Sequence, residues 1–365
     1  MATQKIDSIQ LLRAIAVSLV IFVHASYIGV PIVSAVNPTD SFYHVKSWGA
    51  IGVDLFFCIS GFIMTIVAPS YIKPGGWKKF FLKRIIRIIP LYYLLSGLDA
   101  AVTIFIHHKA LDAITVVKTL IFFPLFDQDN FVVPLISVGW SLSYEIYFYT
   151  LVGILLTFKK HLFRNLLGLL LLLSIIGVVV NPDIVILKFL TSPIILEFGF
   201  GIICGLIYKK ITLTLINVRA LAITLTVIGL GLMLATIFVP LRYSINEATT
   251  IENNNAIAMY RAIAWGIPSA ILLLGVILSE YAFKLRIPLL LILAGDASYS
   301  CYLIHGQVYT AFAILFSRLH LGAIPYLVAI IPLCLGVSIV FYKLVEKQLA
   351  LGVDKLLKPR SLNPI

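Results

Sequence analysis

Apolar runs of about 20 residues, the length that a helix needs to cross a bilayer, recur along almost the whole chain. Of the 365 residues, 61% are hydrophobic and only 12% are charged, which is far from the composition of a soluble domain. The sequence therefore predicts an all-α polytopic membrane protein with about ten transmembrane helices, at residues 10–30, 48–68, 85–106, 136–158, 163–180, 193–208, 219–239, 260–280, 295–316 and 324–345.

The basic residues set the expected orientation. Most of the 28 lysines and arginines fall in the connections on the same side as the N-terminus, so the positive-inside rule places both termini in the cytoplasm. The net charge of +12 is accounted for in this way, and we expect no nucleic-acid partner. No signal-peptide cleavage site precedes the first span, which is therefore expected to be retained. Residues 1–350 are predicted to form one transmembrane domain, and 351–365 a short basic cytoplasmic tail.

Two connections between the predicted spans are not expected to cross the membrane. In the stretch 107–135, the apolar run around 115–126 is too short to span and prolines interrupt it at positions 124 and 134, so we expect an outer re-entrant or interfacial segment. The polar connection 241–259 is expected to be an outer loop. All four cysteines lie inside apolar segments without any metal-ligand spacing, which predicts buried thiols and no disulfide.

The first span contains two ionisable side chains, Arg13 and His24. Eleven residues correspond to three helical turns plus about 20°, so both side chains project from one face, about 16 Å apart along the axis. Ionisable groups inside a membrane usually face a cavity, a partner or a substrate path. The alternative is an Arg13 that extends to the membrane surface and a packed, neutral His24.

Asp54 is the one charge in the second span, within the segment Gly49–Met64. Gly52 and Gly61 in the same segment permit close approach of a neighbouring helix. Asp54 is therefore either part of a polar site or a structural group that caps a helix or pairs with a basic residue.

The fourth span places Ser141, Glu145 and Tyr149 at i, i+4 and i+8, with a hydroxyl one turn from the carboxylate on each side. We expect Glu145 at about the depth of His24, where the carboxylate would orient the imidazole of a general base. The alternative is a structural Glu145 within an aromatic belt around Trp140.

The inner connection before the third span is strongly basic. Lys83, Arg84 and Arg87 share one helical face, and the planar guanidinium groups suit phosphate groups of a cytosolic ligand such as a coenzyme A thioester. The alternative is a topological role together with binding of anionic lipid.

The ninth span carries Ser298, Tyr302 and His305 at i, i+4 and i+7, a polar stripe that indicates an internal face. We rank His305 below His24 as a catalytic group, because a histidine in such a stripe is more often a hydrogen-bonded structural group. No HExxH, CxxC, GxSxG, Walker A or GxGxxG pattern occurs, and no metal is expected.

In these blocks the chain resembles the acyltransferase-3 family of integral membrane acyltransferases. The resemblance rests on Arg13 with His24 and on four further blocks in the same order: GVDLFFCISGF at 52–62, KRIIRIIPLYY at 83–93, GWSLSYEIYFY at 139–149 and SYSCYLIH at 298–305. It implies transfer of an acyl group, often acetyl, from cytosolic acyl-CoA to an exported carbohydrate or other cell-envelope acceptor. It also implies that Arg13 and His24 are essential, and that Arg84 and Arg87 lie on the donor side.

Together these observations predict an O-acyltransferase of the bacterial inner membrane with His24, Glu145 and Arg13 as catalytic residues and Arg84, Arg87 and Lys83 at the donor. Asp54, Trp140, Ser141, Ser298, Tyr302 and His305 are expected to bind substrate or to be structural. Both direct transfer and an acyl-His24 intermediate stay open. The competing classes are a transporter or flippase that uses the same polar residues, and a membrane-embedded sensor or assembly partner. The absence of an evident internal repeat disfavours a repeat-built transporter.

Overall fold

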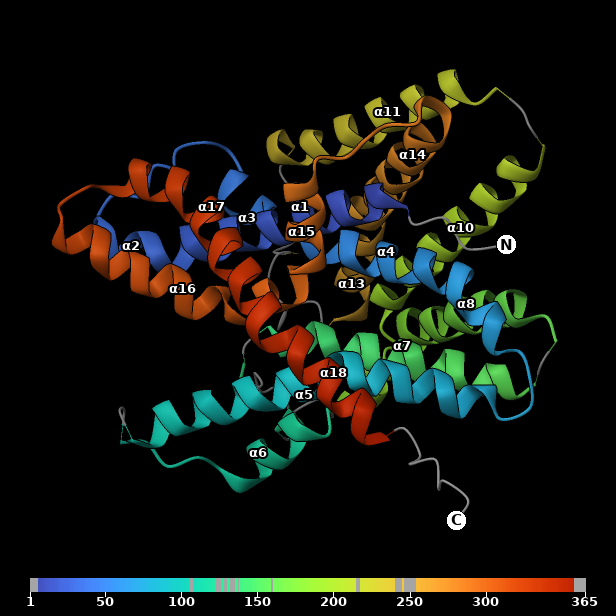
Figure 1. The fold of residues 1–365 in the computed structure, drawn as a ribbon, viewed down its shortest axis with the longest axis horizontal. Helices are drawn as coiled ribbons and strands as arrows, with labels where there is room; N and C mark the ends of the chain where they lie inside the picture. The colour runs from blue at the N-terminus through green and yellow to red at the C-terminus, as the bar shows by residue number, and fades with distance from the viewer. Residues whose placement is uncertain are drawn as a thin grey trace, which may run out of the picture.

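The computed structural model describes residues 6–105, 108–122, 126–127, 130–131, 135–136, 138–158, 160–214, 217–239, 245 and 254–357. Within these ranges the chain is a bundle of helices (Figure 1). The strands in these ranges are β1 (Phe126–Asp127) and β2 (Asn130–Phe131), which pair in antiparallel fashion. The predicted all-α membrane fold class is confirmed.

The helices follow one another in an order that matches the predicted spans. The first half contains α1 (Asp7–His24), the π-helical turn η1 (Ala25–Gly29), α2 (Val30–Val33), α3 (Val45–Trp48), α4 (Ile51–Val67), η2 (Ala68–Tyr71), α5 (Gly76–Phe105), α6 (Ala113–Leu120), α7 (Gly139–Thr157) and α8 (Leu162–Val180). The second half contains α9 (Val185–Leu190), η3 (Pro193–Ile195), α10 (Leu196–Thr214), α11 (Arg219–Phe238), α13 (Asn255–Arg261), η4 (Ala262–Gly266), α14 (Ile267–Phe283), α15 (Leu289–Asp296), α16 (Ser298–Arg318), α17 (Ala323–Phe341), η5 (Tyr342–Glu346) and α18 (Lys347–Leu357).

Eight helices of the described chain are long and apolar enough to cross a membrane, or nine if the bent pair α15 and α16 counts as one span. These nine correspond to nine of the ten predicted spans. The remaining predicted span, at 136–158, corresponds to α7. This helix has 19 residues, but its serines, its tyrosines and Glu145 make it less apolar than the other spans. The difference from the predicted ten therefore lies in the polarity of α7 and not in its helical structure.

The ninth predicted span differs in shape. It begins at Leu289 and bends by 76° between α15 and α16. Gly295 lies directly against the backbone of Gln10 on α1, a position that no larger residue would fit. The bend thus brings the start of α16 against α1.

Two predicted connections are described only in part. In 107–135 the structure contains α6 and the strand pair, and α6 is too short to cross a membrane. Most of the loop 241–259 lies outside the described residues, and α13 begins at Asn255. The region predicted as a tail starts inside α18, which continues to Leu357, and 358–365 lie outside the described residues. The four cysteines are buried as predicted and unpaired.

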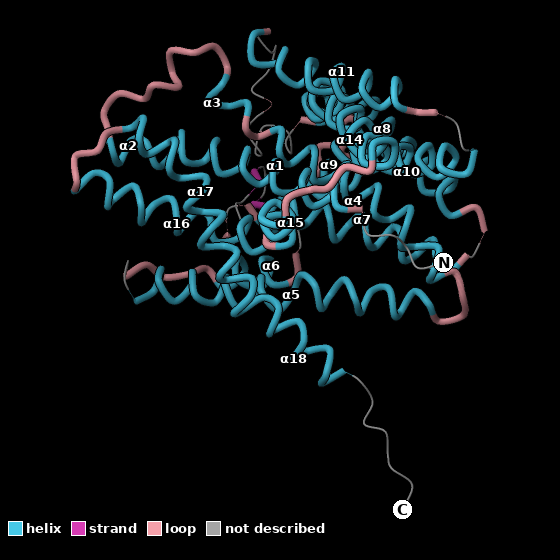
Figure 2. The backbone as a smooth tube through the Cα atoms, turned by 45° about the horizontal axis from the view of Figure 1, so that its top comes forward, coloured by secondary structure: helices cyan, strands magenta, loops and turns pink. Residues whose placement is uncertain are grey.

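Helix α1 lies at the centre of the bundle, where it packs against α4, α14, α15, α16 and α17 (Figures 1 and 2). Beside it, α4 packs against α10 through two glycines. A Cβ atom on Gly61 would lie 2.0 Å from the Phe198 carbonyl oxygen, and one on Gly201 would lie 1.9 Å from the Cys58 carbonyl oxygen. The two helices are therefore in backbone contact, which fixes α4 and its polar side chains in place.

Substitution of Gly201 by alanine is expected to destabilise the fold by about 1–3 kcal/mol, because the methyl group forces α4 and α10 apart. Gly231 on α11 is the matched control, since a Cβ there meets no atom within 4 Å and alanine improves helix propensity. Thermal unfolding monitored with a thiol-reactive dye suits both variants because all four native cysteines are buried. Equal melting temperatures for G201A and G231A would contradict the close-contact argument.

Candidate functional site

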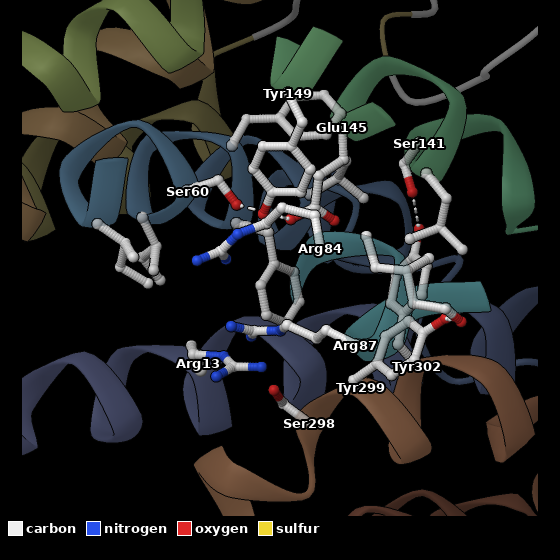
Figure 3. A pocket seen from close by; sticks show the side chains of 17 residues that line it. Arg13, Ser60, Arg84, Arg87, Ser141, Glu145, Tyr149, Ser298, Tyr299 and Tyr302 are labelled. Atoms are coloured by element: carbon white, nitrogen blue, oxygen red, sulfur yellow. Dashed lines mark hydrogen bonds between the residues drawn. The ribbon is translucent and has the colours of Figure 1, made fainter. Parts of the chain in front are cut away.

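A partly enclosed cavity lies between α1, α4, α5, α7 and α16 (Figure 3). Apolar side chains such as Phe56, Phe57 and Ile88 form part of its wall. The polar part of the lining comes from Arg13, Ser60, Arg84, Arg87, Ser141, Glu145, Tyr149, Ser298, Tyr299 and Tyr302. The cavity thus gathers polar groups from all four further blocks of the family resemblance, together with Arg13 from the first span.

Three guanidinium groups converge in this cavity: Arg13 comes from α1, and Arg84 and Arg87 come from α5 (Figure 3). Arg84 is nine-tenths buried, and its Nε has no hydrogen-bond partner within the described chain. Its guanidinium lies 5.3 Å from the ring centre of Tyr149. Arg13 has one weak contact, 3.4 Å from Nη1 to Gln10 Oε1. Unsatisfied N–H donors and concentrated positive charge favour an anion such as a phosphate.

Glu145 is the one carboxylate among the residues that line this cavity. Its Oε1 accepts hydrogen bonds from the Ser60 hydroxyl at 3.0 Å and from the Tyr149 hydroxyl at 2.5 Å. Tyr149 is therefore a partner, as its spacing predicted. Ser141 instead shares a 2.6 Å hydrogen bond with the Tyr302 hydroxyl. Ser60 was missed by the sequence analysis because it lies on another helix, in a segment without a polar stripe.

The predicted position of Glu145 beside His24 is wrong. The carboxylate lies with the arginines and bonds to Ser60 and Tyr149, whereas the His24 Nδ1 lies 2.8 Å from the Val20 carbonyl oxygen. The prediction compared the two residues only by their distance from the ends of their spans. That distance does not determine which side chains on two different helices meet, because the meeting also depends on how the helices pack.

The His24 ring lies next to His305, at 4.9 Å between ring centres and 68° between ring planes. Among the described residues His24 is not part of the cavity lining, but Tyr302 is, and the Tyr302 ring centre lies 6.1 Å from that of His305. The imidazole pair therefore lies behind Tyr302, one turn of α16 from the cavity. The π-helical turn η1 begins directly after His24, a feature that is frequent at functional sites.

Both imidazoles are held in the same way. His24 Nδ1 faces the Val20 oxygen, and His305 Nδ1 faces the Tyr302 oxygen, each at 2.8 Å. A carbonyl oxygen only accepts, so each Nδ1 carries the proton when this bond is made. In the neutral ring the lone pair is then on Nε2, the nitrogen that can act as a base or a nucleophile.

Asp54 has a structural partner that the sequence did not identify. Arg261 at the end of α13 donates to both carboxylate oxygens, from Nε at 3.0 Å and from Nη2 at 2.8 Å. Both side chains are almost fully buried. The guanidinium also lies 5.9 Å from the ring centre of Trp140. Pairing with a basic group, one of the two interpretations of Asp54, is thus confirmed, and Trp140 packs above the pair.

The remaining predicted residues lie at or near the cavity. The Ser298 hydroxyl is buried and lines the cavity without a hydrogen-bond partner in the described chain. Tyr299, which the sequence did not single out, also lines the cavity, and its hydroxyl donates to the Ile88 carbonyl oxygen and so connects α16 to α5. Lys83 lies outside this cavity, on a neighbouring groove. Within the described residues, no three His, Cys, Asp or Glu side chains are grouped to hold a metal ion.

The fold and the cavity define an integral membrane protein with three arginines and one carboxylate in the lining of a cavity between its helices. The chain belongs to the acyltransferase-3 family, whose acyltransferase domain matches residues 6–343. It is therefore a membrane acyltransferase.

Among characterised proteins, the chain is 29% identical over 310 residues to the exopolysaccharide production protein ExoZ of Rhizobium meliloti (strain 1021). The match covers 84% of this chain and 91% of ExoZ. No solved structure matches the chain significantly.

Proposed function

We propose that this protein transfers an acyl group, with acetyl as the expected group, from cytosolic acyl-CoA to a hydroxyl of an exported or lipid-linked carbohydrate. The observation that carries the donor assignment is the convergence of Arg13, Arg84 and Arg87 in one cavity, where the Nε of Arg84 has no hydrogen-bond partner in the described chain. The similarity to an exopolysaccharide production protein supports a polysaccharide as the acceptor.

The reaction assigned to His24 begins when its Nε2 removes the proton of the acceptor hydroxyl. The hydroxyl oxygen attacks the thioester carbonyl, the new C–O ester bond forms, and the C–S bond breaks. The proton passes from His24 to the leaving thiolate, which departs as coenzyme A. In the variant mechanism Nε2 of His24 attacks the thioester carbonyl, and the C–S bond breaks to release the coenzyme A thiolate. The acceptor hydroxyl then attacks the acyl carbonyl, the C–N bond to His24 breaks, and the hydroxyl proton balances the thiolate, so that coenzyme A is released as the thiol.

Tyr302 separates the cavity from the imidazole pair, so the thioester reaches His24 only if the Tyr302 side chain moves. Its hydroxyl lies 2.6 Å from the Ser141 hydroxyl and 3.3 Å from the Val138 carbonyl oxygen, so these two contacts hold the side chain in place. Glu145 is assigned to the arginine end, where its charge offsets part of the positive charge. There it has a positioning role.

Replacement of both Arg84 and Arg87 by alanine is expected to raise the KM for acyl-CoA about a hundredfold or more, because each lost charge-assisted hydrogen bond costs about 1.5–3 kcal/mol. The matched control is R164A/R286A, which removes the same charge from two exposed arginines remote from the cavity lining. The assay uses purified protein, radiolabelled acetyl-CoA and envelope polysaccharide.

Two outcomes of this assay count against the proposal. An unchanged KM in R84A/R87A contradicts the donor site. An intact thioester in the presence of wild-type protein and all candidate acceptors contradicts acyl transfer from coenzyme A and favours a carrier. Comparison of envelope polysaccharide from deletion and wild-type cells by mass spectrometry then identifies the modified hydroxyl.

A further inference from the structure

A groove lies between α5 and the C-terminal elements η5 and α18. Helix α18 packs against α5 (Figures 1 and 2). It adjoins the cavity that contains Arg13 and Glu145, because Arg84 and Arg87 line both spaces. Its polar lining consists of Lys83, Arg84 and Arg87 from α5, Tyr342 and Glu346 from η5, and Lys347 from α18. The groove therefore forms an outer extension of the arginine site.

The groove carries a strong excess of positive charge. Four cationic side chains line it against one carboxylate, Glu346, whose Oε2 accepts a hydrogen bond from the Ser300 hydroxyl at 2.5 Å. Lys347 is exposed and makes no hydrogen bond or ion pair within the described chain. At the inner end of the groove, the nine-tenths buried Arg84 leaves its Nε without a partner. Cations that are placed together without partners favour a polyanionic ligand.

The order of the two spaces matches a ligand with one charged end and one neutral end. The groove is cationic and open, whereas the adjoining cavity has Phe56, Phe57 and Leu142 in its wall. Tyr342, half-buried on the groove wall, offers an aromatic ring to a purine.

We propose that this groove binds the nucleotide end of the acyl donor, with its phosphate groups between Lys83, Lys347 and the pair Arg84 and Arg87 at the inner end of the groove, while the thioester arm continues into the cavity. This inference rests on the proposed function and adds the C-terminal helix α18 to the donor site. Glu346 opposes the phosphate groups, so its charge limits the affinity for the donor. An anionic lipid headgroup has the same phosphate chemistry and is the competing occupant.

The test measures equilibrium binding of three probes to the full chain in nanodiscs of neutral phosphatidylcholine: acetyl-CoA, adenosine 3′,5′-bisphosphate and S-acetyl-pantetheine. Lys347→Glu is expected to weaken binding of the two nucleotides about tenfold or more and to leave acetyl-pantetheine unchanged. Glu346→Gln keeps an acceptor for Ser300 but removes the charge, and is expected to tighten nucleotide binding. Lys343→Glu is the matched control, because Lys343 is exposed on η5 and is not part of the groove lining.

Three results would overturn the groove assignment. One is nucleotide affinity that is equal in K347E and the wild type, and a second is equal weakening by K343E and K347E, which indicates a general effect of charge. A third is loss of wild-type nucleotide binding when anionic phosphatidylglycerol replaces part of the phosphatidylcholine, since lipid then occupies the groove. Failure of the proposed function looks different, because wild-type protein then binds none of the three probes. Tighter binding in E346Q cannot result from misfolding and so supports the assignment independently.

Discussion

Replacement of His24 by alanine is expected to lower acyl transfer about 10²–10⁴-fold, which is the usual contribution of a general base. The reason is chemical, because Nε2 of His24 carries the lone pair once Nδ1 donates to the Val20 carbonyl oxygen. Donor affinity should change little, since His24 is absent from the lining of the arginine cavity. The measurement is kcat and KM for acetyl-CoA with purified protein, where a fall in kcat at constant KM is expected.

Two controls separate chemistry from folding in the His24 experiment. His320→Ala removes an exposed histidine and should leave kcat unchanged. Added imidazole should restore part of the activity of H24A, because a small base can enter the space that the side chain leaves. Near-normal transfer by H24A would refute the assignment of His24.

The same variant distinguishes direct transfer from the acyl-histidine route. With radiolabelled acetyl-CoA and no acceptor, the two-step route predicts label on the wild-type protein and none on H24A. Direct transfer predicts label on neither protein until the acceptor is added.

The membrane fold was predictable because it depends on a local property, the length of apolar runs. Nine of the ten predicted spans correspond to helices that are long and apolar enough to cross a membrane. The break at Ala297 was not predicted, because the predicted span began at residue 295 and left out the apolar helix α15 that precedes the break. Next to the break, Gly295 packs against Gln10 of α1, almost 300 residues earlier in the chain.

The contents of the cavity were also predictable in part. Helical spacing correctly placed Tyr149 beside Glu145 and the Tyr302 stripe on an internal face. It did not give the tilt of one helix against another, so it put Glu145 beside His24 and left Ser60 out. The spacing of residues within a helix predicts which side chains share one face of that helix. Which side chains of different helices meet depends on the packing of the whole bundle.

The ion pair between Asp54 and Arg261 could not be predicted from spacing within one span, because the two residues are 207 positions apart. Spacing within one span indicated only that Asp54 needs a partner. Only the fold identifies Arg261, which also donates from Nη1 to the Ile245 carbonyl oxygen at 2.7 Å. The energetic consequence of this pairing is large enough to measure.

Replacement of Arg261 by methionine is expected to destabilise the protein by about 3–5 kcal/mol, since it leaves the charge of the buried Asp54 without a partner. The double variant Asp54→Asn with Arg261→Met should be more stable than R261M alone, because it also removes the stranded charge. The melting temperature from the thiol-reactive dye assay measures both effects. Arg286→Met, at an exposed position, is the matched control and should melt like the wild type.

Donor binding provides the second readout of this pair. Asp54 and Arg261 are absent from the lining of the arginine cavity, so the double variant should bind acetyl-CoA with nearly wild-type affinity once it is folded. A loss of affinity without a loss of stability would instead make the pair part of the donor site. An R261M protein that melts at the wild-type temperature would show that the Asp54 carboxylate is not desolvated, because a buried unpaired charge cannot be free of cost.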